Sequence, residues 1–215
     1  MTAPVDGLRP PQQERSRRTL EHLLQAGAEV LAERGYDGLS VAEVCRRAGI
    51  SAGALYTRFE GKDALVRAIH AQVMADLSAE VAALYAPSPE WDALPTPVLI
   101  EQAVRGLVSH FRGHAAIVRA IVLRAAVDSV MRAEGAIAVG RMADAFTRLL
   151  LTRAADVAAA DPEATVRAAF TMVFETTSWD VTFGSEFRAT GALGPEVDER
   201  LVTVCRLLLT TAPAD

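Results

Sequence analysis

The most informative stretch of this chain is SVAEVCRRAGISAGALYTRF, residues 40–59. Ser40 is followed three residues later by Glu43, the spacing of a capping box at a helix N-terminus. Ser51 is a second favourable N-cap residue, and Gly49 lies where a tight turn needs a residue that tolerates a positive φ angle. The stretch therefore predicts a short helix, a turn and a second short helix over 52–59, which is the order of a helix-turn-helix.

The second of these helices has one apolar side, since Leu55 and Phe59 are one turn apart and are expected to anchor it from behind. A small, polar front suits a helix that enters the major groove of DNA, which is about 12 Å wide. The spacing alone leaves another interpretation open, an ordinary helical hairpin with a polar outer face. The front is made of Ala52, Gly53, Tyr56 and Thr57, with Arg58 at the side.

Helical periodicity continues on both sides of this stretch. A preceding helix carries Leu20, Leu23 and Leu31 on one face and ends at Gly35. No segment alternates apolar and polar residues as a strand would, so we predict an all-α chain of about nine helices. Beyond residue 59, helices are expected from Lys62 to about Tyr85 and over 97–112, 115–131, 134–159, 162–184 and 195–211.

Composition restricts the class of protein. Of the 215 residues, 51% are apolar, which is enough for a sizeable core. The longest stretch without a charged residue runs from Ala48 to Thr57, shorter than the roughly 18 apolar residues of a membrane-spanning helix. The first 18 residues lack the apolar segment of a secretory signal, and the two cysteines suit a reducing compartment. We therefore expect a cytoplasmic protein.

The net charge of −5 is unevenly distributed. Residues 1–70 hold ten basic and nine acidic residues, a net of +1, whereas residues 71–215 hold twelve and eighteen, a net of −6. The N-terminal part is therefore the better candidate for contact with a polyanion.

From residue 35 to residue 65 the sequence GYDGLSVAEVCRRAGISAGALYTRFEGKDAL resembles the N-terminal signature of the tetracycline-repressor (TetR/AcrR) family of bacterial transcription regulators. Nearly every position of that signature is filled. Three departures are Cys45 in place of a usual alanine, Ala52 and Ala54 in place of polar residues, and Arg58 in place of a frequent histidine or tyrosine. The resemblance implies an N-terminal arm and helix-turn-helix DNA-binding domain over 1–62, and a helical effector-binding and dimerisation domain over 63–215.

The resemblance also implies roles at DNA. Tyr56 would contact a phosphate or a thymine methyl group, and Thr57 and Ala52 would face base edges. Lys62 and the arginines near the N-terminus would meet phosphates. The expected DNA-binding residues are Arg15, Arg17, Arg18, Ser51, Ala52, Gly53, Tyr56, Thr57, Arg58 and Lys62.

The C-terminal helices carry two further predicted sites. Large apolar side chains suit a pocket for a small apolar effector, although each is also an ordinary core candidate. The pocket candidates are Phe111, Met142, Phe146, Phe170, Phe174, Trp179 and Asp180. Apolar stripes on the last two helices, together with the family's usual dimer, predict a four-helix dimer interface of Val166, Phe170, Val173, Thr177, Leu201, Val204, Cys205 and Leu208.

Catalysis, cofactors and metals are not expected. Cys45 is predicted on the buried face of a helix without a neighbouring histidine, so it suits packing better than nucleophilic chemistry. His110 and His114 are four residues apart, but the sequence offers no third ligand beside them. We predict no enzyme activity, no cofactor and no metal site.

The predicted function is that of a ligand-responsive, DNA-binding transcriptional regulator. Its expected partners are a second copy of the chain, a pseudo-palindromic operator in double-stranded DNA and a small apolar effector that releases a repressor. The alternatives are a helical ligand-binding protein without DNA binding, or an activator.

Overall fold

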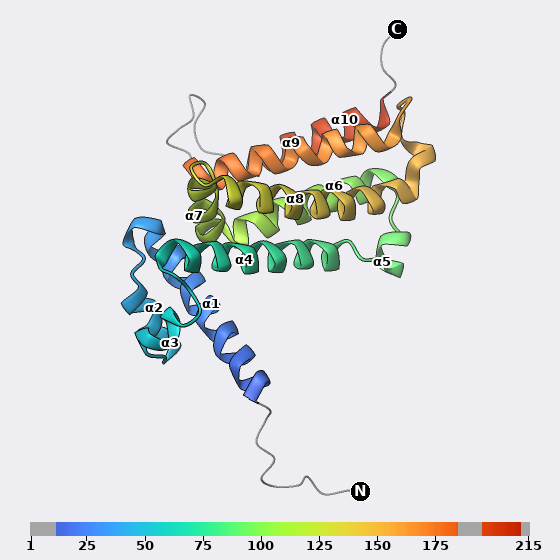
Figure 1. Cartoon of the computed structure of the whole chain (residues 1–215). Coiled ribbons are helices and arrows are strands. Elements are labelled where there is room, and N and C mark those ends of the chain that lie inside the picture. The colour runs from blue at the N-terminus through green and yellow to red at the C-terminus, as the bar shows by residue number, and fades with distance from the viewer. Residues whose placement is uncertain (1–11, 185–194, 212–215) are drawn as a thin grey trace, which may run out of the picture. The chain divides into compact units, whose positions relative to one another are not determined.

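The computed structural model describes residues 12–184 and 195–211, with side chains from Ser16 onward. These residues form ten α-helices, one 3₁₀ helix and no strand (Figure 1). The chain divides into two compact units, one up to His70 and one from Ala71 onward. The domain boundary at 62/63 stays a prediction. The helices are α1 (Gln12–Gly38), α2 (Val41–Ala48), α3 (Ala52–Tyr56), α4 (Lys62–Leu84), α5 (Pro89–Asp92), α6 (Thr96–Gly113), α7 (Ala115–Ala125), α8 (Ser129–Leu150), the 3₁₀ helix (Leu151–Asp156), α9 (Pro162–Phe183) and α10 (Pro195–Thr210).

The N-terminal unit contains α1, α2, α3 and the beginning of α4. Its fully buried side chains include Leu23 and Leu31 on α1, Leu55 on α3 and Leu65 on α4. On α1, Gly27 allows a close approach, because a Cβ atom there would lie 2.4 Å from Cδ1 of Ile69 on α4. The helical φ/ψ values of α1 are interrupted at Gly35, where φ is 66°, which confirms the predicted helix end.

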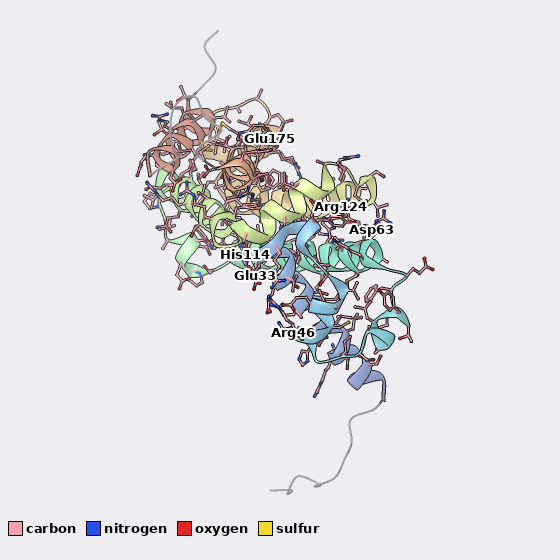
Figure 2. The ribbon with its side chains drawn as sticks, turned by 90° about the vertical axis from the view of Figure 1, so that its left-hand side faces the viewer. Glu33, Arg46, Asp63, His114, Arg124 and Glu175 are labelled. Atoms are coloured by element: carbon pink, nitrogen blue, oxygen red, sulfur yellow. The ribbon has the colours of Figure 1, made fainter. Side chains whose placement is uncertain are left out.

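An ion-pair network fixes α2 against α1. Arg47 donates two hydrogen bonds to the Glu33 carboxylate on α1, at 2.6 and 2.7 Å, and a third to Glu43 at 3.0 Å. Arg46 donates two more to Glu43, each 2.8 Å long. Hydrogen bonds from Arg46 and then from Arg47 lower the pKa of Glu43 to about 2, and a hydrogen bond from Arg47 lowers the pKa of Glu33. Figure 2 labels Glu33 and Arg46.

The C-terminal unit is built around α9. This helix packs against α6, α7, α8 and α10, and Figure 1 shows α9 and α10 side by side above α6 and α8. A chain of aromatic rings fills the interior: Phe146 contacts Tyr85 and Phe170, and Phe174 contacts Phe170 and Phe111, at ring-centroid distances of 5.4 to 5.9 Å. The buried Tyr85 hydroxyl donates to the carbonyl of Ala103 at 2.8 Å, and burial raises its pKa.

Three helix boundaries in the C-terminal unit differ from the prediction. α8 ends at Leu150 and is followed by the 3₁₀ helix, whereas the helix was predicted to continue to residue 159. α7 ends at Ala125 and α8 begins at Ser129, because the Asp128 carboxylate accepts hydrogen bonds from the N–H groups of Val130 and Met131 and caps α8. Gly135, next to the predicted helix start at residue 134, lies well inside α8. The one-turn helix α5 lies between the helix predicted to end near Tyr85 and the helix predicted to begin at residue 97. No helix of the described chain is long and apolar enough to cross a membrane.

The predicted dimer stripes are partly wrong. On α9, Val166, Phe170, Val173 and Thr177 are each 2% exposed or less, so they pack inside their own chain and offer no surface to a partner. Leu201 and Cys205 on α10 are buried in the same way, and burial raises the pKa of Cys205 to about 12. The large apolar side chains that these two helices do expose are Trp179, Phe183, Val204, Leu207 and Leu208.

The network around Glu43 gives the stability of the chain a defined pH dependence. A carboxylate whose pKa is lowered on folding stabilises the folded state above its unfolded pKa, and that contribution is lost as the pH falls through the folded pKa. For Glu43 this window runs from about 4.5 down to about 2. We expect Glu43→Gln to flatten the fall of the thermal unfolding midpoint in this window, as measured by circular dichroism of the full chain.

The matched control is Glu60→Gln, since Glu60 is exposed and lies outside the network. That variant should keep the steep fall of the original chain. A Glu43→Gln profile that stays parallel to the original profile would contradict a stabilising role for the Glu43 carboxylate.

Candidate nucleic-acid interface

The turn between α2 and α3 has the geometry that the sequence predicts. Gly49 adopts φ 67° and ψ 31°, and the N–H of Ile50 donates to the carbonyl of Cys45 at 3.0 Å. The Ser40 hydroxyl accepts from the N–H of Glu43, and the Ser51 hydroxyl accepts from the N–H of Ala54 at 3.1 Å. Each short helix therefore has a side-chain cap at its N-terminus, and the left-handed glycine turns the chain between them.

α3 rests on a single buried side chain. Leu55 is fully buried, whereas Phe59, predicted to share this role, is half-buried and lies beyond the helix end at Tyr56. The chain leaves α3 one turn earlier than expected, and the N–H groups of Arg58 and Phe59 both bond to the carbonyl of Leu55, at 2.8 and 3.0 Å. Every other residue of α3 is exposed, and Tyr56 is 58% exposed. The small, polar front predicted for this helix therefore faces outward.

A hydrogen bond joins the end of α3 to the start of α1. The Arg58 guanidinium donates to the Ser16 hydroxyl at 2.8 Å, across 42 residues of sequence. The exposed residues Arg17 and Arg18 directly follow Ser16, so the structure brings predicted cations from two distant segments to one neighbourhood. Arg17 also pairs with Glu21 one turn later, at 3.4 Å. The side chain of Arg15 lies outside the described part of the chain.

Lys62, at the first position of α4, makes two contacts within its own chain. Its ammonium group lies 4.4 Å from the centroid of the Tyr36 ring and donates to the carbonyl of Asp37 at 3.4 Å. The Tyr36 hydroxyl in turn donates to the Asp63 carboxylate. An ammonium group carries three N–H donors, so these contacts orient the Lys62 side chain without using all of them.

Two features of this unit were missed from the sequence. Arg46 lies on α2 with a side chain that is 69% exposed, next to the predicted surface residues. Its partner Glu43 holds both Arg46 and Arg47, at spacings of three and four residues. That spacing on a helix indicates ion pairs and is visible in the sequence. The contact of Arg47 with Glu33 is not visible in the sequence, because it joins two different helices.

The predicted effector residues lie in different environments. Four of them, Phe111, Met142, Phe146 and Phe170, are buried, and Phe174 and Asp180 are half-buried. Trp179 is 48% exposed, and its ring contacts the ring of Phe183. They remain candidates.

The cysteine considered for catalysis is a packing residue. Cys45 is buried, and burial raises the pKa of its thiol, which disfavours the reactive thiolate.

A family model matches residues 23–69 and is described as bacterial regulatory proteins, tetR family. YvdT of Bacillus subtilis, an HTH-type transcriptional regulator by name, is 41% identical over 49 residues, or 23% of this chain and 25% of that protein. Rv2912c of Mycobacterium tuberculosis, of the same description, is 45% identical over 49 residues with the same coverage. This chain thus matches about a quarter of the length of these curated relatives.

Solved structures extend the similarity to the whole fold. A protein from Mesorhizobium loti described as a TetR-family transcriptional regulator superposes with a TM-score of 0.72 at 18% identity, over 90% of this chain and 96% of that one. GusR of Salmonella enterica gives a TM-score of 0.67 at 18% identity, over 94% and 98%. FadR of Bacillus subtilis, solved with stearoyl-CoA, gives a TM-score of 0.60 at 16% identity, over 90% of this chain and 100% of that one. Residues 23–69 of this chain therefore match the model of the tetR family of bacterial regulatory proteins, and the described chain has the fold seen in solved TetR-family regulators.

Proposed function

We propose that this chain is a homodimeric, DNA-binding repressor of transcription that a small apolar effector releases from its operator. The observation that carries the proposal is α3, a capped helix that buries Leu55 and exposes its remaining residues within the segment that matches the TetR family. A short helix with a small, polar outer face can enter the major groove, and cations beside it can meet phosphates.

The contacts divide into two kinds. Tyr56, Thr57, Ala52 and Gly53 reach base edges, because they are exposed on or directly after α3. Thr57 still has a free lone pair for this purpose, although its hydroxyl donates to the carbonyl of Ala54. The phosphate contacts come from Ser51 at the α3 N-terminus and from Arg15, Arg17, Arg18, Arg58 and Lys62 around it.

The first test concerns Tyr56, the largest exposed side chain of α3. We expect Tyr56→Ala to weaken binding to the DNA upstream of the chain's own gene by about 1–3 kcal/mol, the value of a good base contact. Binding to a duplex of unrelated sequence should change less, because phosphate contacts dominate there. Band shifts at fixed salt on both duplexes measure the two effects.

Ile137→Ala is the control, since it removes an exposed apolar side chain from α8 and should leave both affinities unchanged. If Tyr56→Ala weakened binding to both duplexes equally, Tyr56 would not contribute to sequence recognition. A chain that binds neither duplex would favour a ligand-binding protein without DNA binding.

A second copy of the chain is the proposed partner of α9 and α10. These adjacent helices expose five large apolar residues, among them Trp179 at 48% and Leu207 at 58%. Contiguous exposed apolar surface on a protein in water favours association. Of the interface residues predicted from the sequence, Val204 and Leu208 are exposed and remain in the proposal. They are four residues apart and so share one side of α10.

Charge placed on this side should separate the dimer. We expect Val204→Asp combined with Leu208→Asp to give a folded monomer at micromolar concentration, measured by analytical ultracentrifugation. Leu201→Asp is unsuitable, because Leu201 is buried in its own chain and a charge there would unfold it. Val127→Asp is the control at a 75% exposed residue between α7 and α8, and it should remain dimeric. An unmodified chain that is monomeric at this concentration would contradict the proposed dimer.

The effector is proposed to bind in the C-terminal unit, beside the aromatic side chains of α6, α8 and α9. FadR of Bacillus subtilis has the same fold and was solved with stearoyl-CoA. This similarity supports an effector with a large apolar part. The link to the DNA-binding unit is α4, which runs unbroken from Lys62 to Leu84. A shift of this helix by effector would oppose DNA binding, and linkage then requires DNA to oppose effector binding by the same factor. Such a regulator acts in the cytoplasm.

A further inference from the structure

Three side chains that sequence analysis did not combine meet in the C-terminal unit. Glu80 comes from α4, His110 from the last turn of α6, and His114 from the residue that caps α6. One carboxylate oxygen of Glu80 lies 2.8 Å from Nε2 of His114 and 3.6 Å from Nδ1 of His110. The centroids of the two imidazole rings are 5.0 Å apart, and one ligand atom from each of the three residues lies within 4.8 Å of the others. His114 is labelled in Figure 2.

An ion pair between Glu80 and His114 does not explain why His110 also faces the Glu80 carboxylate. The His110 side chain is 9% exposed and turns its Nδ1 atom toward the Glu80 oxygen, while its other ring nitrogen, Nε2, is buried without a hydrogen-bond partner in the described chain. The two imidazoles converge on one and the same oxygen of the Glu80 carboxylate.

We propose that Glu80, His110 and His114 bind one divalent transition-metal ion, with Zn²⁺ as the best-suited ion. Two histidines and one carboxylate are a recurrent three-ligand set for zinc, and they leave a fourth coordination position open. Histidines four residues apart also match the spacing at which one helical segment supplies two zinc ligands. The open position takes water or an anionic group of a second molecule.

Two of the three distances between the ligand atoms are close to those of an occupied site, and the two histidine nitrogens, which lie within 4.8 Å of each other, need to approach further. Bonds of about 2.0–2.1 Å in a tetrahedron place neighbouring ligand atoms about 3.3 Å apart. The Glu80 oxygen is 2.8 and 3.6 Å from its two neighbours, so shifts of a few tenths of an ångström on that side are sufficient. Glu80 is 50% exposed, which allows an ion to enter.

A bound ion would cross-link α4 to the corner between α6 and α7. Glu80 is in the last turns of α4, and both histidines lie where α6 ends and α7 begins. Metal occupancy would therefore restrain the part of α4 that belongs to the C-terminal unit. This inference goes beyond the proposed function and does not depend on DNA binding.

The test uses the full, untagged chain after removal of metals with a chelator. Zn²⁺ is titrated in competition with a chromogenic chelator, and Co²⁺ is used as a spectroscopic substitute. We expect one Zn²⁺ per chain with micromolar or tighter affinity, and the visible absorption of Co²⁺ in a tetrahedral site. Glu80→Gln and His114→Gln should each weaken Zn²⁺ binding by at least about tenfold, the lower end of the loss seen when only a hydrogen-bond partner of a ligand is changed. Both should abolish the Co²⁺ absorption.

His22→Gln is the matched control, because His22 is an exposed histidine on α1 in the N-terminal unit. It should bind Zn²⁺ as the original chain does. Circular dichroism of each metal-free variant checks that the fold is intact, and the titration of the unmodified chain does not depend on any variant. The proposal is overturned if the unmodified chain binds Zn²⁺ more weakly than micromolar. It is also overturned if Glu80→Gln and His114→Gln bind Zn²⁺ as tightly as His22→Gln does.

Discussion

The left-handed turn at Gly49 is the constraint on which the proposed DNA-binding surface depends. With φ at 67°, this residue ends α2 and lets Ser51 begin α3 two residues later. A side chain at this φ would strain the backbone. α3 ends at Tyr56 and buries only Leu55, so its other residues face outward. The ion pairs of Arg47 with Glu33 and Glu43 hold α2 on α1, so the turn is built on a fixed support.

The two units use different physics. The N-terminal unit combines a small aliphatic core with charged networks at its surface, including the Arg47 network and the contact of Lys62 with Tyr36. The C-terminal unit buries a chain of aromatic rings between α6, α8 and α9 and exposes apolar side chains on α9 and α10. An exposed polar helix with cations suits a polyanion, whereas exposed apolar helices suit a copy of the same protein. The charge difference between the halves of the chain agrees with this division.

Local signals predicted the helix-turn-helix well, because the N-caps Ser40 and Ser51 and the turn residue Gly49 act through neighbouring backbone atoms. The α7–α8 boundary was misplaced because Gly135 is tolerated within a helix, while the capping carboxylate of Asp128 was overlooked. Periodicity identified apolar faces on α9 and α10, but it does not say whether a face packs against its own chain or a partner. Phe170 on α9 packs inside its own chain, whereas Val204 on α10 is exposed. The cluster of Glu80 with His110 was beyond sequence reasoning, since 30 residues separate them and only tertiary packing joins them.

The central claim is that two copies of this chain each present α3 to one DNA duplex. Selection of bound sequences from a random duplex library by the full-length chain tests it most directly. The account predicts an enriched sequence with two-fold symmetry whose half-site centres are about one helical turn apart, roughly 34–36 Å. Enrichment of no sequence, or of one without internal symmetry, would contradict it.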